Sequence, residues 1–118
     1  MLYGDEEDRR LVVRSILYPI VFTIFTRDLT VLQQAPLKLH RPYVHLLEHA
    51  MGRMTRQLRD VRKEMKRRQI TVTSGETSGD VTRYSIFIRG YEEEMRFPNA
   101  HLRNLAEQLM HHVLLQKL

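Results

Sequence analysis

The segment Leu47–Arg68, LEHAMGRMTRQLRDVRKEMKRR, is the best-organised part of this chain and decides its fold. Its apolar residues recur alternately four and three positions apart, which is the spacing of a heptad seam along one side of a helix. These seam residues are Leu47, Met51, Met54, Leu58, Val61 and Met65. The pattern predicts one long amphipathic helix over about residues 42–68, and Pro42 suits its first turn, where a missing N–H costs nothing.

Positive charge is concentrated on the same segment. Eight Lys or Arg residues lie between Arg53 and Arg68, against only Asp60 and Glu64. On the heptad, six of them take positions b, c and f, on the side turned away from the seam. These candidate nucleic-acid-binding residues are Arg53, Arg56, Arg59, Lys63, Lys66 and Arg67. A line of cations on one helix face can neutralise several phosphates, although it can also be no more than a solvated helix back.

The residues between these cations indicate whether a single-stranded or a double-stranded nucleic acid is the expected ligand. No aromatic residue interleaves them, so the sequence offers no platform on which unpaired bases could stack. Contact with the backbone of a duplex is therefore the expected mode of binding.

Composition indicates one domain, residues 1–118, of an ordinary globular protein, with 42% apolar and 28% charged residues. The net charge of +5 arises in residues 41–70, which hold nine bases and three acids. Cysteine is absent, and the acidic start is the reverse of a signal peptide's leader, so we expect a cytoplasmic protein. The apolar run 16–25 supplies half of the roughly 20 residues that a bilayer requires, which favours a core helix and no membrane contact.

Outside the central helix, the sequence predicts an α+β domain in the order helix, helix, β-hairpin, helix. A first helix is expected from about Asp5 to Thr26, with a kink at Pro19, followed by an extended connector or short strand up to residue 41. Residues 70–73 and 83–89 alternate in polarity around a turn-forming segment and predict two antiparallel strands. For residues 92–97 a third strand and a loop both stay open. The last helix begins after Pro98.

A winged helix-turn-helix is an alternative arrangement of these elements. It treats Gly52 as a turn, with the hairpin as the wing and the last helix available for dimerisation. Two observations oppose it. The heptad phase runs unbroken through Gly52, and the wing tip carries Glu76 and Asp80 where phosphate contact requires Lys or Arg.

The pattern His45-Leu46-Leu47-Glu48-His49 matches the HxxEH motif of inverted zinc proteases, in which two histidines bind the metal and the glutamate is the general base. If Leu47 faces the core, His45 and His49 face water, where nothing encloses a metal ion. We interpret the motif as fortuitous. No metal site, cofactor site or catalytic grouping is predicted, and the protein is expected to be non-enzymatic.

Three further segments resemble a group of small uncharacterised proteins from Bacillus-type Gram-positive bacteria. They are PLKLHRPY at residues 36–43, Gln69-Ile70 at the start of the hairpin, and IRGYEE at residues 88–93 followed by Arg103-Asn104. The resemblance extends over nearly the whole chain and implies a bacterial, cytoplasmic protein with one compact domain. It carries over no functional residue.

Two hypotheses about function follow. In the first, the protein is a small cytoplasmic nucleic-acid-binding or regulatory protein that contacts duplex nucleic acid through the basic helix face. A homodimer is expected, because the seam and the last helix together offer more apolar surface than a small domain buries alone. In the second, it is a homo-oligomeric interaction or structural protein without nucleic-acid binding.

Overall fold

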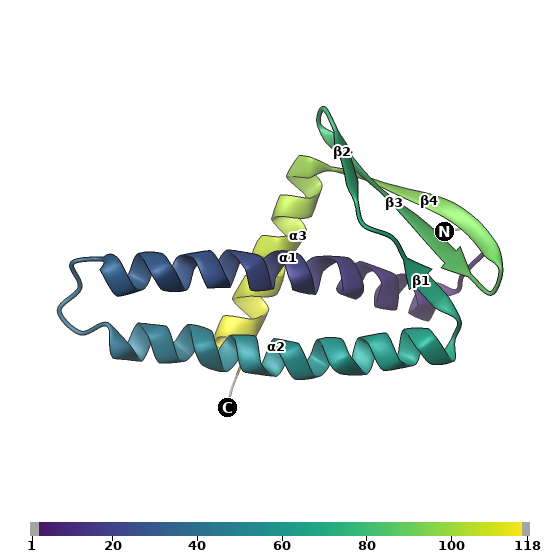
Figure 1. Cartoon of the computed structure of the whole chain (residues 1–118). Coiled ribbons are helices and arrows are strands. Elements are labelled where there is room, and N and C mark those ends of the chain that lie inside the picture. Colours follow the sequence, from purple (N-terminus) through teal and green to yellow (C-terminus); the bar gives the residue numbers. More distant parts are fainter. Residues whose placement is uncertain (1–2, 117–118) are drawn as a thin grey trace.

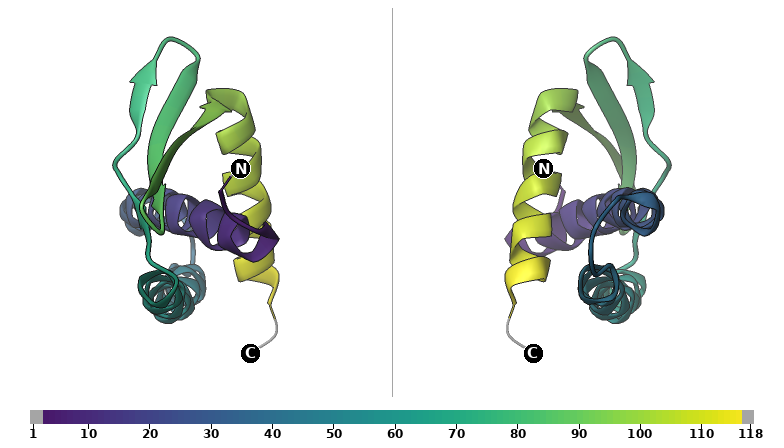
Figure 2. Two further views of the ribbon diagram at one scale, coloured as in Figure 1. Left: turned by 90° about the vertical axis from the view of Figure 1, so that its right-hand side faces the viewer. Right: turned by 90° about the vertical axis from the view of Figure 1, so that its left-hand side faces the viewer.

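The computed structural model describes residues 3–116, which form three helices and a four-stranded antiparallel sheet in one α+β domain. The helices are α1 (Glu6–Gln34), α2 (Arg41–Arg67) and α3 (Asn99–Leu115), and the strands are β1 (Ile70–Val72), β2 (Glu76–Ser78), β3 (Val81–Ile88) and β4 (Tyr91–Pro98). Helices α1 and α2 form a long antiparallel hairpin, and α3 crosses one face of it (Figures 1 and 2). The sheet lies at the end of this hairpin where α1 begins and α2 ends.

The central helix is continuous, as the heptad pattern predicts. Helix α2 runs through Gly52 without a turn, which excludes the two-helix arrangement that a winged helix-turn-helix requires. Four seam residues are buried (Leu47, Met54, Val61 and Met65), and Met51 and Leu58 are half-buried. The seam packs against α1 of the same chain. The apolar surplus that favoured a homodimer is therefore partly covered within one chain, and the homodimer stays a prediction.

The prediction for the first helix is right at its start and wrong at its end. Asp5 is the N-cap: its side chain accepts the N–H of Asp8, and the Asp8 side chain accepts the N–H of Asp5, which makes a capping box. The helix runs through Pro19 to Gln34 rather than ending near Thr26. Residues 27–34 stay helical because Leu29 and Leu32 pack against the cluster shared with α2, and only residues 35–40 form the connector.

Because α1 is longer than predicted, its length must be compared again with that of a membrane-spanning helix. By length and composition alone, α1 is apolar enough to cross a bilayer, a test that the core helices of soluble proteins also pass. The apolar part of this helix is therefore longer than residues 16–25, which by themselves supply only half of a membrane span. Within the described structure, α1 contributes to both hydrophobic clusters and packs on α2, α3 and β1. The cytoplasmic location stays a prediction.

The sheet confirms the predicted hairpin and decides the open question about residues 92–97. Strand β3 is central: β4 pairs along one edge, from Ile88↔Tyr91 to Val81↔Pro98, while β1 and β2 share the other edge. Residues 92–97 are thus a strand. The turn between β3 and β4 has positive φ at both Arg89 (48°) and Gly90 (89°), the conformation of a tight hairpin turn.

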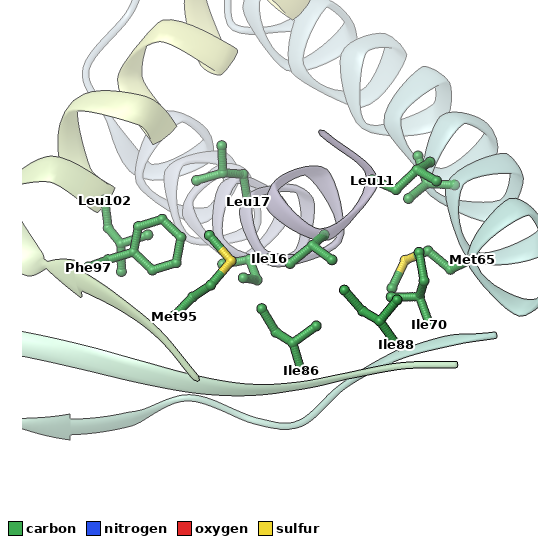
Figure 3. Packing of buried hydrophobic residues seen from close by; sticks show 12 residues of the cluster. Leu11, Ile16, Leu17, Met65, Ile70, Ile86, Ile88, Met95, Phe97 and Leu102 are labelled. Atoms are coloured by element: carbon green, nitrogen blue, oxygen red, sulfur yellow. The ribbon is translucent and has the colours of Figure 1, made fainter. Parts of the chain in front are cut away.

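Two hydrophobic clusters hold these layers together. The first joins the inner face of the sheet to the start of α1 and the end of α2, with Ile16, Ile70, Ile86 and Met65 converging on one volume (Figure 3). The second lies where α3 crosses the helical hairpin, and Phe25 and Met54 are its largest fully buried side chains. The basic side of α2 faces away from both clusters.

Two glycine-to-alanine substitutions are expected to change stability in opposite directions. A Cβ at Gly75 would lie 2.7 Å from the Tyr84 ring, so Gly75→Ala should destabilise the protein by about 1–2 kcal/mol. Gly52 lies inside α2, and the nearest atom to a Cβ there is 3.8 Å away. Gly52→Ala should therefore stabilise it by about 1 kcal/mol, the difference in helix propensity. Chemical denaturation of both variants measures the change in the free energy of unfolding. Changes of the same sign in both variants would contradict the local geometry described for the two glycines.

Candidate nucleic-acid interface

The outer face of α2 carries four exposed cations at helical spacing, Arg56, Arg59, Lys63 and Lys66, which we call the basic stripe. At 100° per residue they fall within about a quarter of the helix circumference, on the side opposite Met54 and Met65. From Arg56 to Lys66 the helix rises about 15 Å. In the described part of the chain, none of the four is in an ion pair. The stripe thus presents its charge to solvent.

Arg53, the first of the six predicted residues, does not lie on this exposed face. Its Nη2 donates a hydrogen bond to the carbonyl oxygen of Val113, near the C-terminal end of α3. Its Nε and Nη1 are buried and have no hydrogen-bond partner among the described residues. Because α3 crosses α2 here, Arg53 faces the last carbonyls of α3, where a cation is favourable and an unpaired acceptor is available. The expectation that Arg53 is exposed is wrong.

Arg67, the last of the six, is exposed but paired. Its Nε lies 3.0 Å and 3.1 Å from the two carboxylate oxygens of Glu64. Hydrogen bonds from Arg67 and then Arg68 lower the pKa of Glu64 to about 2. Glu64 therefore stays ionised and offsets part of the Arg67 charge, so Arg67 adds less to the outer field than the four residues of the basic stripe.

Arg62 is the cation that the heptad assignment omits. It is exposed and, in the described residues, free of ion pairs, and it lies beside the basic stripe on the edge nearer to Met65. A helical wheel drawn at 100° per residue, rather than heptad positions, would have placed it at this edge. Between Arg56 and Lys66, the outer surface of α2 thus has five cations available, with Asp60 as the exposed acidic residue of that segment.

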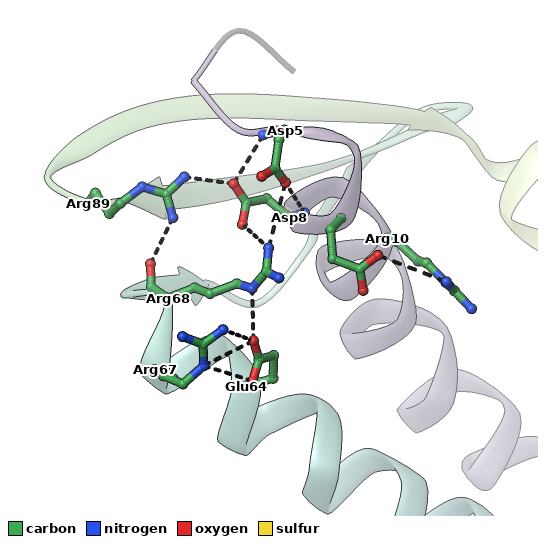
Figure 4. A network of polar contacts seen from close by, with 8 residues as sticks. Asp5, Asp8, Arg10, Glu64, Arg67, Arg68 and Arg89 are labelled. Atoms are coloured by element: carbon green, nitrogen blue, oxygen red, sulfur yellow. Dashed lines mark hydrogen bonds and ion pairs between the residues drawn. The ribbon is translucent and has the colours of Figure 1, made fainter.

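A separate ionic network joins the start of α1, the end of α2 and the turn between β3 and β4 (Figure 4). At its centre is Asp8, which is 1% exposed and contacts Arg89 Nη2 at 2.6 Å and Arg68 Nη1 at 3.1 Å. Burial raises the pKa of Asp8, but hydrogen bonds from Arg89, the Asp5 N–H and Arg68 outweigh it and lower that pKa to about 2. Asp8 therefore pairs with Arg68 and Arg89 and offsets part of their charge within the protein.

The histidine motif lies on the outer face of α2 as well. His45, Glu48 and His49 are all exposed. Among residues 3–116, no three His, Asp or Glu side chains come close enough together to hold a metal ion. His45 and His49 thus have no third ligand close to them among the described residues.

Comparisons with known proteins give one family. The profile of a family described as YhjD protein matches residues 3–118. Over 106 residues the chain is 34% identical to a protein of Bacillus subtilis (strain 168) named "Uncharacterized protein YhjD", a match that covers 90% of this chain and 88% of the relative. No solved structure matches the chain. These findings confirm the resemblance to small proteins of Bacillus-type bacteria.

Proposed function

We propose that this chain, which belongs to the YhjD protein family, is a non-enzymatic nucleic-acid-binding protein that contacts the backbone of duplex nucleic acid through the basic stripe of α2. The observation that carries the proposal is the set of four exposed, unpaired cations on one face of a rigid helix, within the described residues. Duplex DNA has a phosphate about every 3.4 Å along each strand, so the 15 Å stripe matches about four phosphates.

The arrangement of the other charges supports the same surface. Arg53, Arg67 and Arg68 each bond to other groups of this chain, whereas no residue of the stripe is in an ion pair with another described residue. The seam on the opposite side of α2 packs against α1, which lies over one side of α2 in Figure 2, so the stripe lies on a side that α1 does not cover. Such contacts recognise the charge of the backbone and not a base sequence.

The test is binding to a 20-base-pair DNA duplex of arbitrary sequence at several salt concentrations. With about four phosphates neutralised, affinity should fall about 100-fold between 50 mM and 200 mM salt, because counterion release gives a slope near −0.9 per phosphate. Replacing Arg56, Arg59, Lys63 and Lys66 by Gln should abolish binding and leave the melting temperature nearly unchanged, since these side chains are exposed. Fluorescence anisotropy of a labelled duplex measures the affinity of the wild type and of the variant, and a thermal melt of each protein measures its melting temperature.

A matched control removes four positive charges elsewhere. Arg9, Arg27, Arg83 and Arg103 are exposed residues of α1, β3 and α3, and their joint replacement by Gln gives the same net charge as the stripe variant. It should bind the duplex within about threefold of the wild type. Equal losses in the two variants would mean that net charge, and not the stripe, attracts the duplex, and the proposal would be wrong.

The second candidate is a homo-oligomer without nucleic-acid binding. It is favoured by exposed apolar side chains toward the outer end of the helical hairpin, away from the sheet: Phe22, Val31, Leu39, Tyr43 and Leu46. This candidate predicts a solution mass of at least two chains and no duplex binding at any salt concentration. The wild-type titration described above therefore separates the two.

A further inference from the structure

A groove of about 620 Å³ lies between α1, the last turns of α2 and the segment that follows α2. This volume lies in the range of small-molecule sites, roughly 300–1,000 Å³. The groove lies beside the first hydrophobic cluster, and its base is formed by three buried side chains of that cluster: Ile16 of α1, Met65 of α2 and Ile70 of β1. Figure 3 shows these three side chains converging from their elements. The half-buried Ile20 of α1 and Val72 of β1 also line it and add accessible apolar surface.

One wall of the groove is positively charged. Arg62 and Lys66, one helical turn apart on α2, both line it and are exposed. Of the fifteen described residues that line it, none is Asp or Glu. No salt bridge among the described residues involves Arg62 or Lys66, so their charge is not offset by the protein.

The opposite wall is polar and neutral. It consists of Tyr84 and the segment 73–75, and Gly75 lets this segment approach the Tyr84 ring, since a Cβ there would lie only 2.7 Å from it. The phenol of Tyr84 can donate a hydrogen bond at neutral pH, as an ordinary tyrosine does, and burial raises its pKa further above the usual value. The groove thus combines an apolar floor, two cations on one rim and neutral donors on the other.

We propose that this groove binds a single-tailed anionic amphiphile, whose apolar chain lies against Ile20 and Val72 above the buried base of the groove and whose anionic head contacts Arg62 and Lys66. Charge complementarity selects the head, because cations without an acidic neighbour attract an anion and repel a cation of the same size. Burial of the chain against apolar side chains supplies affinity. This binding is independent of the basic stripe except for Lys66, which belongs to both surfaces.

Isothermal titration calorimetry with decanoate tests the proposal, with decyltrimethylammonium as the cationic ligand of equal chain length and acetate as the head without a chain. One decanoate should bind per chain, and the other two ligands should bind at least tenfold more weakly. Equal binding of the two decyl compounds would overturn the assignment of the charged rim, and equal binding of acetate would overturn that of the apolar floor.

Variants locate the site. Ser15 of α1 lines the groove, and its hydroxyl donates a hydrogen bond to the Val12 carbonyl. Ser15→Phe therefore places a ring in the groove and should weaken decanoate binding at least tenfold. Arg62→Gln should weaken it about tenfold, a loss of one charge-assisted contact, and this exposed position keeps the test valid if the first variant fails to fold. Arg59→Gln, on the basic stripe but not in the groove, is the matched control and should change it less than twofold.

Two further results would contradict the proposal. The first is decanoate binding that neither Ser15→Phe nor Arg62→Gln changes. The second is binding of the protein to vesicles rich in phosphatidylglycerol without binding of free decanoate, which would indicate a membrane surface instead of a single amphiphile. Because Ser15→Phe leaves the basic stripe intact, it should keep duplex binding, so failure here and failure of the proposed nucleic-acid function are distinguishable.

Discussion

Met54→Asp is expected to leave the protein unfolded, or to cost it about 5 kcal/mol or more. Met54 is 1% exposed and packs in the second hydrophobic cluster with Phe25 and Val113, at the crossing of the three helices. The substitution removes a core side chain, which alone costs about 2–5 kcal/mol, and adds a carboxylate. The cluster consists of hydrophobic side chains, so burial of that carboxylate there adds a further penalty. Native domains have a total stability of only about 5–15 kcal/mol.

Circular dichroism and a thermal melt measure this effect. The control is Thr55→Asp, which introduces the same charge at the next residue of α2, where the side chain is exposed. It should change the free energy of unfolding by no more than about 0.5 kcal/mol. A Met54→Asp protein that melts at the wild-type temperature would show that the seam of α2 does not face α1 and α3.

Asp8→Asn is expected to cost about 2 kcal/mol at neutral pH, and this cost should vanish in acid. Asp8 has a pKa of about 2 in the folded protein, below its ordinary value of 3.8, because Arg89, the Asp5 N–H and Arg68 hold its charged form against the opposing effect of burial. A lowered pKa stabilises the fold fully above about pH 4, and the stabilisation is lost as the pH falls toward 2. The shift of nearly two units corresponds to about 2 kcal/mol.

The measurement is urea denaturation of both proteins from pH 7 to pH 2. The two curves of unfolding free energy against pH should be parallel above pH 5 and should converge between pH 4 and pH 2. A constant difference over the whole range would mean that Asp8 acts through packing and not through its charge. Glu64, whose pKa is also lowered, gives the wild type a second loss of stability in the same direction, and Asp8→Asn retains that loss.

Local sequence patterns were sufficient to predict most of the order of helices and strands. The heptad seam predicted a continuous α2, alternation predicted β1 and β3, and the acidic start predicted the first turn of α1. The end of α1 was predicted eight residues too early, at Thr26 instead of Gln34. Residues 27–34 have little apolar periodicity of their own, and their helix is stabilised by the antiparallel partner α2, which a single segment of sequence does not reveal.

The candidate site also has one part that the sequence predicted and one part that depends on the tertiary structure. Exposure of Arg56, Arg59, Lys63 and Lys66 follows from helical period alone, because the side of α2 opposite its seam must face water unless another element covers it. Arg53 has the same type and nearly the same spacing, yet it bonds the Val113 carbonyl. Periodicity along α2 contains no information about where α3 ends.

By itself, the sequence determined which face of α2 is apolar and which is basic, because both follow from residue spacing within one helix. Only the tertiary structure decided which cations remain free, since Arg68 and Arg89 meet at Asp8 from positions 60 and 81 residues away along the chain. It also decided where the groove lies, whose walls come from α1, α2 and the sheet. The physical reason is that ion pairs and grooves depend on the distance between elements, whereas amphipathicity depends on the geometry of one element.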